Sequence, residues 1–158
     1  MPRNFKSTAH LQNPDPKFGS MLATKIINKL MLDGKKTTAQ KIFYDALDLA
    51  SKKLPDAEGQ EDIFNKAIEN TRPSVEVRSK RVGGANYQVP REVKRARQQS
   101  LAIRWVIDNS RKKKGKPMAQ RLAEELVDAY NGQGASVSWK ENVHKMAEAN
   151  KAYAHYAR

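Results

Sequence analysis

The chain has 158 residues, a mean hydropathy of −0.80, no cysteine and a formal net charge of +13. This length predicts a single domain, residues 1–158, and the absence of cysteine excludes disulfides, thiolate zinc sites and cysteine nucleophiles. No apolar run approaches the roughly 20 residues of a membrane span, and no apolar secretory segment opens the sequence, so we expect a cytoplasmic protein without a membrane partner.

The first 17 residues show no hydrophobic periodicity, and three prolines interrupt any helix there. We predict an extended basic arm over residues 1–17, with Arg3 and Lys6 among its cations. The alternative is a terminus that stays disordered until a partner binds.

Three helices are predicted between this arm and Pro73. Gly34 provides a stop for the first helix, the second ends before Pro55, and Pro73 stops the third. Thr37 and Gln40 have the spacing of a capping box at the start of the second helix. Apolar residues recur at helical spacing in each: Phe18, Leu22, Ile26 and Leu30, then Ala39, Phe43, Ala46, Leu47 and Ala50, then Ile63, Phe64, Ala67 and Ile68.

After Pro73 the hydrophobic period changes from helical to alternating. Val75 and Val77 alternate with polar residues, and so do Tyr87 and Val89 further along the chain. Two adjacent glycines between these runs supply the conformational freedom of a tight turn. The pattern predicts a β-hairpin arm over residues 73–90, closed by Pro90.

Three more helices complete the predicted fold. Val93, Ala96, Ser100, Ile103 and Ile107 mark the fourth, and Met118, Leu122, Leu126 and Ala129 the fifth, which Pro117 opens and Asn131-Gly132 closes. The sixth is expected at about residues 140–156, after a connector that begins at Gly134. The sequence therefore predicts an all-α protein, a six-helix bundle with a β-ribbon arm between the third and fourth helices.

The positive charge is concentrated around the hairpin and the fourth helix. Residues 71–114 hold 13 basic residues against three acidic ones, a net charge of +10. A field this concentrated indicates a polyanionic partner, most commonly a nucleic acid. Tyr87, Trp105, Trp139 and Tyr153 can stack on bases, although core packing is the favoured interpretation for Trp105 and either exposure or packing fits Trp139.

The sequence offers little material for catalysis or metal binding. His144 and His155 fall on one helix face about three turns apart, whereas a metal pair needs about one turn, and His10 lies in the arm. The Glu61-Asp62 and Glu124-Glu125 pairs suit solvated helix faces. We therefore expect no catalytic residue, no cofactor, no metal and no small-molecule substrate.

Six segments form an ordered pattern over nearly the whole chain: 15–20 DPKFGS, 33–36 DGKK, 72–84 RPSVEVRSKRVGG, 87–90 YQVP, 101–105 LAIRW and 146–156 MAEANKAYAHY. In this pattern the chain resembles the bacterial-type ribosomal protein seven family of the small (30S) subunit. The resemblance implies six helices with a β-ribbon after the third, the same order that the periodicity predicts.

The resemblance also implies a function. Members of this family bind the 3′ major domain of 16S rRNA directly and nucleate assembly of the subunit head, with the ribbon near exit-site tRNA and mRNA. The implied partners are small-subunit rRNA, exit-site tRNA, mRNA and neighbouring head and platform proteins. The implied location is the small ribosomal subunit of the cytoplasm or of an organelle.

The resemblance assigns two sets of residues. For rRNA binding they are Arg3, Lys6, Lys35, Lys36, Arg72, Arg78, Lys80, Arg81, Arg91, Lys94, Arg95, Arg97, Arg111, Lys112, Lys113 and Lys114. Near tRNA and mRNA they are Ser79, Arg81, Val82, Gly83, Gly84, His144, Lys145 and Tyr153.

The chain departs from the family pattern at two places. Asn4 and Phe5 stand where the arm is usually richer in arginine, which weakens the expected arm contacts. Ser138, Trp139 and Lys140 stand where many members carry three basic residues, and stacking by Trp139 is one replacement for an ionic contact.

Two other functions are weighed against this one. A basic architectural DNA-binding protein would explain the charge equally well. An RNA-processing enzyme is disfavoured because no clustered acid, base or metal set is found.

Overall fold

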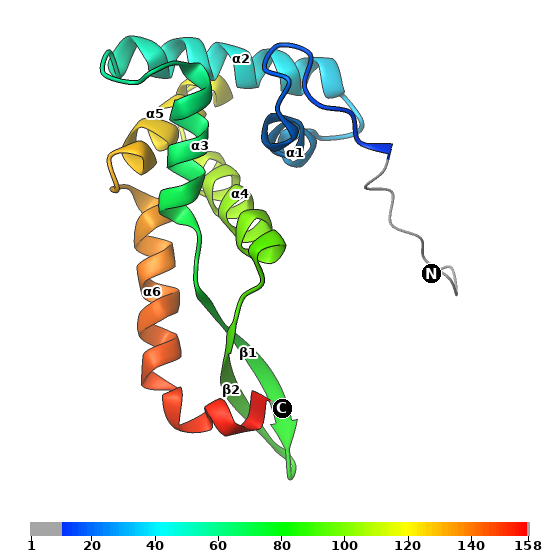
Figure 1. Cartoon of the computed structure of the whole chain (residues 1–158), viewed down its shortest axis with the longest axis vertical. Coiled ribbons are helices and arrows are strands. Elements are labelled where there is room, and N and C mark those ends of the chain that lie inside the picture. Colours follow the sequence, from blue (N-terminus) through cyan, green and yellow to red (C-terminus); the bar gives the residue numbers. More distant parts are fainter. Residues whose placement is uncertain (1–10, 158) are drawn as a thin grey trace.

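The structure, a computed structural model, describes residues 11–157, so Arg3, Lys6 and His10 lie outside the described residues. Its elements are α1 Met21–Leu30, α2 Lys36–Lys53, α3 Gln60–Thr71, β1 Val75–Val82, β2 Ala85–Glu92, α4 Arg95–Lys112, α5 Met118–Tyr130, α6 Ala135–Ala149 and the 3₁₀ helix η2 Lys151–Ala157. Helices α1 to α5 form a bundle, from which the ribbon and α6 extend together (Figure 1). The prediction of an all-α fold with a hairpin after the third helix is confirmed.

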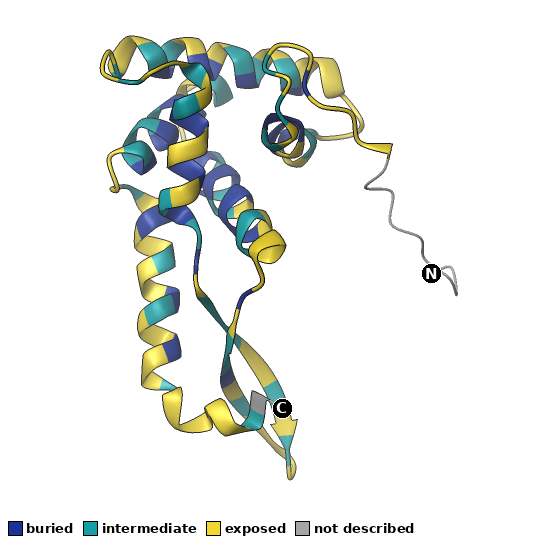
Figure 2. Ribbon diagram, in the orientation of Figure 1, coloured by how far each residue is buried: buried dark blue, intermediate teal, exposed yellow. Residues whose placement is uncertain are grey.

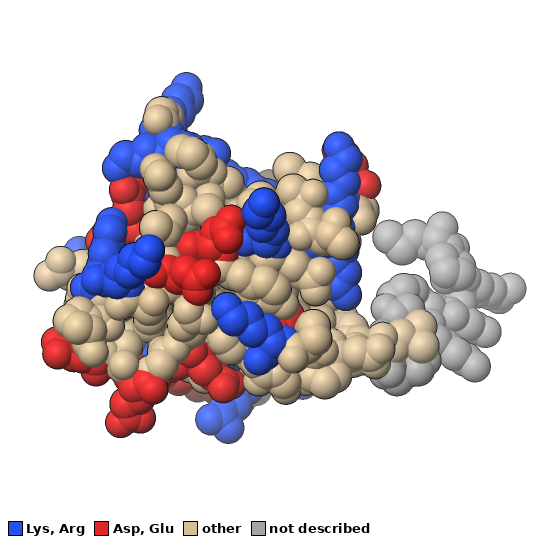
Figure 3. All heavy atoms as spheres, turned by 90° about the horizontal axis from the view of Figure 1, so that it is seen from above, with Lys and Arg blue, Asp and Glu red and all other residues tan. Residues whose placement is uncertain are grey.

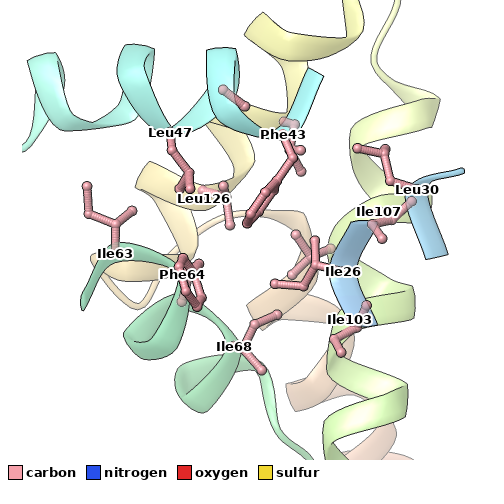
Figure 4. Packing of buried hydrophobic residues seen from close by; sticks show 14 of the residues in the cluster. Ile26, Leu30, Phe43, Leu47, Ile63, Phe64, Ile68, Ile103, Ile107 and Leu126 are labelled. Carbon is pink, nitrogen blue, oxygen red and sulfur yellow. The ribbon is translucent and has the colours of Figure 1, made fainter. Parts of the chain in front are cut away.

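The hydrophobic core lies inside the bundle. Phe43 of α2 and Phe64 of α3 are fully buried, with ring centroids 5.8 Å apart, and Phe18 packs edge-on against both. Ile107 of α4 and Leu126 of α5 complete the same cluster (Figure 4). Burial falls away along the ribbon and α6 (Figure 2), so these two elements depend on contacts with each other.

The chain before α1 is fixed to the bundle by a buried carboxylate. Asp15 is 3% exposed and accepts hydrogen bonds from the backbone N–H groups of Lys17 and Phe18, at 3.1 and 3.2 Å. The Tyr44 hydroxyl donates a third bond to Asp15 at 2.7 Å. Burial, followed by the hydrogen bond and the charge of Asp15, raises the pKa of Tyr44 to about 12.

The ribbon is a two-stranded antiparallel hairpin in which Val75 pairs with Glu92 and Val82 with Ala85. Gly83 and Gly84 form the turn with φ of 57° and 90°, a region that favours glycine. The predicted closure at Pro90 is wrong, because Pro90 pairs with Val77 and β2 continues to Glu92. Proline is tolerated there because a ribbon of two strands has an unpaired edge on each side.

Two predicted helix boundaries are also wrong. Helix α2 begins at Lys36 without a side-chain cap, so Thr37 and Gln40 lie within the helix and form no capping box. Helix α6 begins directly after Gly134 rather than near residue 140. The backbone N–H of Ser136 donates to the buried Glu125 carboxylate at 2.9 Å, so a side chain from α5 satisfies the start of α6.

The end of the last predicted helix differs as well. Helix α6 stops at Ala149, and the chain turns into η2, which folds against β2 (Figure 1). Aromatic contacts with Tyr87 hold η2 there, through Tyr153 at 5.1 Å and Tyr156 at 5.3 Å between ring centroids. No helix within residues 11–157 is both long enough and apolar enough to cross a membrane.

Candidate nucleic-acid interface

Cations, most of them exposed, gather where the ribbon leaves the bundle. We call this the ribbon-base surface and define it by Arg72, Arg78, Lys94, Arg95 and Arg97. Lys94, Arg95 and Arg97 stand at the start of α4 and are exposed. Lys94 and Arg95 form no ion pair within residues 11–157, so both are available to a ligand.

One carboxylate orients two guanidinium groups of the ribbon-base surface. Arg78 Nε lies 2.7 Å from Glu76 Oε1, and Arg97 Nη2 lies 3.2 Å from Glu76 Oε2. The side chain of Glu76 is only 15% exposed, whereas those of Arg78 and Arg97 are 51% and 43% exposed. Glu76 thus holds one guanidinium from the ribbon and one from α4 side by side while leaving about half of each open.

The remaining cations at the ribbon base are more enclosed. Arg72 pairs with Glu69 at 2.6 Å and, with Arg95 and Gln99, lines a shallow hollow. Arg91 is half-buried, and its Nε has no hydrogen-bond partner among the described residues. These guanidiniums leave less of their surface for a partner than Arg95 does.

A second hollow, between α1 and α4, contains cations that the sequence analysis missed. We call it the α1–α4 groove; it is lined by Gln12, Lys25, Asn28, Lys29, Gln99 and Arg104, among others. Lys25 Nζ donates to Gln99 Oε1 at 2.8 Å, which ties the two helices together. Gln99 lines both hollows, so the groove continues the ribbon-base surface toward α1.

The sequence contains a pattern that could have revealed these lysines. Lys25, Asn28 and Lys29 recur at helical spacing opposite the apolar stripe of α1. A charge count over residues 71–114 does not include α1, so it could not reveal these lysines.

The four basic residues at the end of α4 point to different places. Lys113 Nζ pairs with the fully buried Glu125 at 2.9 Å and with Asp128 at 3.6 Å. Arg111 donates to the Leu30 carbonyl at 3.2 Å. Lys112 lies over the Trp139 ring, and Lys114 is exposed without an ion pair in residues 11–157. Two of these four residues, Arg111 and Lys113, thus already hold helices together.

The residues expected near tRNA and mRNA fall into two groups. Arg81, Ser79 and the two turn glycines are exposed at the ribbon tip, with Val82 half-buried among them. Lys80 of the same strand instead donates to the Tyr156 carbonyl at 2.8 Å.

The other group lies along α6 and η2. Lys145 is exposed, and Tyr153 packs against Tyr87 of the ribbon. His144 lies at the foot of the ribbon, where its Nε2 accepts the Ser74 backbone N–H at 3.1 Å. Burial lowers the pKa of His144 below its usual value, and the charge of Lys140 lowers it further.

Two further lysines of the predicted set lie apart from the ribbon. Lys35 and Lys36 are exposed between α1 and α2, and Lys36 lines a small hollow with Asn13 and Gln40. Lys36 thus lies beside the chain that leads into α1.

The prediction that both acidic pairs lie on solvated helix faces is wrong for Glu125, which is fully buried, and three of the four carboxylates have partners within the fold. Glu125 binds Lys113 and Ser136, Glu124 binds Lys116, and Asp62 accepts the Tyr130 hydroxyl at 3.1 Å. Within residues 11–157 no group of three His, Cys, Asp or Glu is placed to hold a metal ion.

Comparisons of the sequence with known proteins all indicate the same family. The sequence model of the family described as ribosomal protein S7p/S5e matches residues 2–151. The chain is 62% identical over 143 residues to small ribosomal subunit protein uS7 of a Nitratiruptor species, covering 90% of this chain and 91% of the relative. Identity to uS7 of Fervidobacterium nodosum is 53% over 156 residues, 98% of each chain. Identity to uS7 of Chloroflexus aurantiacus is 52% over 158 residues, 100% of this chain and 99% of the relative.

Proposed function

Because this chain belongs to the ribosomal protein S7p/S5e family and is a structural constituent of the small ribosomal subunit, we propose that it binds small-subunit rRNA directly. The proposed site is the 3′ major domain of 16S rRNA, where binding nucleates assembly of the subunit head. The role is structural, since the protein fixes a folded RNA and is fixed by it. The observation that carries this proposal is the ribbon-base surface with its continuation into the α1–α4 groove.

The mechanism is electrostatic positioning. Lysine and arginine neutralise phosphates and release counterions, and this term supplies much of the affinity. Glu76 orients Arg78 and Arg97 before binding, so less side-chain freedom is lost when phosphates arrive. The ribbon-base surface and the groove present cations from three separate elements, an arrangement that suits a folded RNA junction better than a straight duplex.

The ribbon tip has a separate role in the proposal. Its exposed cation Arg81 and the glycine turn project away from the bundle, which suits proximity to exit-site tRNA and mRNA. Lys145 lies on α6 and Tyr153 on η2, two elements that lie beside the ribbon (Figure 1). Neighbouring head and platform proteins of the cytoplasmic small subunit are the remaining proposed partners.

The proposal predicts a specific change in salt dependence. Arg95→Ala should weaken binding to a transcript of the 3′ major domain and flatten the slope of log affinity against log salt by about 0.7 to 0.9. Filter-binding titrations over a range of salt concentrations measure this slope, and Arg97→Ala should act in the same direction.

Lys113→Ala is the matched control, because we propose that the ion pairs of Lys113 with Glu125 and Asp128 take it out of the rRNA-binding set that the family resemblance implies. Its ammonium already serves the buried Glu125, so the variant should lose about 1–3 kcal/mol of unfolding free energy while the salt slope stays nearly unchanged. An unchanged slope in both arginine variants, or a preference of the wild type for duplex DNA over the rRNA transcript in competition, would refute the proposal.

A further inference from the structure

A large aromatic side chain is exposed beside the end of α4. Trp139 lies in the second turn of α6, and its exposure is 45%, whereas the other tryptophan, Trp105, is half-buried in α4. Leaving part of an indole in water forgoes part of the hydrophobic gain that its burial would bring. An exposed tryptophan therefore points to a ligand that covers it.

A cation already lies on this ring. Lys112 Nζ is 5.0 Å from the centroid of Trp139 and also donates to Asn109 Oδ1 at 3.4 Å. The ammonium is thus held between α4 and α6, with its side chain still exposed. An indole and a cation next to each other match the two parts of a nucleotide, which has a planar base and a charged phosphate.

The helices that carry this pair are fixed to each other. Asn109 of α4 donates to Ser136 Oγ of α6 at 3.4 Å, and Ser136 Oγ donates to the buried Glu125 of α5 at 2.6 Å. Glu125 in turn pairs with Lys113, the residue that follows Lys112. Three helices therefore set the position of the ring, so that a base would meet an ordered platform.

We propose that Trp139 and Lys112 form a binding site for one unpaired RNA base and its adjacent phosphate. The indole stacks on the base, and the ammonium neutralises the phosphate. This inference rests on the proposed rRNA binding and adds a stacking contact to an otherwise ionic interface.

The local charge favours RNA over a protein partner. Lys114, two residues beyond Lys112, is exposed without an ion pair in residues 11–157, and Lys112 would repel a lysine or arginine that approached the ring. An apolar protein surface would have to bury the Lys112 ammonium without a counterion, which costs free energy. Glu141 is the nearest acidic residue along α6, and it is exposed to solvent.

Tryptophan fluorescence tests the stacking directly. On titration with the 3′ major-domain transcript, emission of the wild type should be quenched, and Trp139→Phe should lose most of that quenching because Trp105 is half-buried in α4 and outside the proposed site. Quenching of equal size in Trp139→Phe would assign the signal to Trp105 and overturn the inference.

Affinity and its salt slope separate the two members of the pair. Trp139→Ala should lose about 5- to 150-fold in affinity, the range for removal of one stacked base, with an unchanged salt slope because stacking releases no counterion. Lys112→Ala should flatten the slope by about 0.7 to 0.9. Trp139→Phe should keep most of the affinity.

Met146→Ala is the matched control, since Met146 is 49% exposed on the same helix and should change affinity less than about 2-fold. If the wild type binds the transcript and Trp139→Ala binds equally well, this inference fails and the proposed function stands. If the wild type does not bind the transcript at all, both fail.

Discussion

One histidine joins the start of the ribbon to α6. The Ser74 backbone N–H donates to His144 Nε2, and only an imidazole that is unprotonated at Nε2 can accept this bond. Burial lowers the pKa of His144, and Lys140, whose ammonium is bound to the Asn70 carbonyl at 2.6 Å, lowers it further. The neutral form is thereby favoured in the folded protein.

His144 should give the protein a pH-dependent stability. The pKa of His144 in the folded protein lies below its unfolded value of about 6.5, so the unfolded chain binds more protons as the pH falls. The stabilisation by the neutral imidazole is therefore complete above about pH 6.5, and it is lost as the pH falls through the folded pKa. The difference in unfolding free energy between wild type and His144→Ala, measured in urea, should be larger at pH 8 than at pH 5. Lys145→Ala, at the exposed neighbouring residue, should show no such change, and equal differences for His144→Ala at both pH values would contradict the prediction.

At the scale of the residue, the sequence predicts which side chains are charged but not where each of them points. Lys112, Lys113 and Lys114 are identical in kind, yet one lies on an indole, one pairs with a buried carboxylate and one is exposed. The difference depends on Glu125 and Trp139, which come from α5 and α6. No local pattern could have revealed these partners, because they are brought together only by the tertiary fold.

Among the secondary-structure elements, η2 packs against the ribbon and stabilises its position. Tyr153 and Tyr156 stack on each other with an interplanar angle of 11°, and both contact Tyr87 of β2. The Tyr156 carbonyl accepts the Lys80 ammonium from β1. An isolated hairpin is only marginally stable, so these contacts set how rigidly the ribbon projects.

Removal of residues 151–158 should loosen the ribbon and leave the bundle intact. Each aromatic pair contributes about 0.5–1.5 kcal/mol, so amide exchange across residues 75–92 should quicken by roughly 10- to 100-fold. Hydrogen exchange with mass spectrometry measures this, with the core helices α3 and α5 as internal reference. Unchanged exchange in the ribbon would show that η2 does not stabilise it, and Tyr153→Phe, which keeps the ring, should behave like the wild type.

The existence and order of the elements were predictable, whereas their ends were not. Apolar periodicity reveals a helix wherever one face is buried, as in α2 and α5. The start of α6 depends on the Glu125 carboxylate, and its end depends on the docking of η2 against Tyr87. Both are long-range contacts, which act on helix ends more strongly than local propensity does.

The whole molecule has an uneven distribution of charge. Residues 71–114 carry a net charge of +10, whereas residues 36–70, which include α2 and all of α3 except Thr71, hold five basic and seven acidic residues. Viewed onto the α2 end, the surface shows carboxylates mixed with cations (Figure 3). The molecule therefore favours approach of a polyanion to the ribbon side of the bundle.

Neutralising carboxylates at the far end should have little effect on RNA affinity. Asp45→Asn, Glu58→Gln and Glu61→Gln combined should change it less than about 3-fold at 0.15 M salt, where the Debye length is about 8 Å. The matched variant, Lys94→Gln with Arg95→Gln, should lower affinity strongly and flatten the salt slope by about 1.4 to 1.8. Equal effects of the two variants would contradict a localised binding surface.

Pro90 has a consequence for the protein before it finds its partner. Each strand of the ribbon has one unpaired edge, and such edges invite strands from other copies to pair with them and aggregate. Pro90 lacks the N–H that β-pairing needs, and Arg78 and Arg81 place like charges on the opposite strand. Proline and like charges at a strand edge oppose such pairing, so we expect the cations that we assign to RNA also to disfavour ribbon-to-ribbon association of newly made chains.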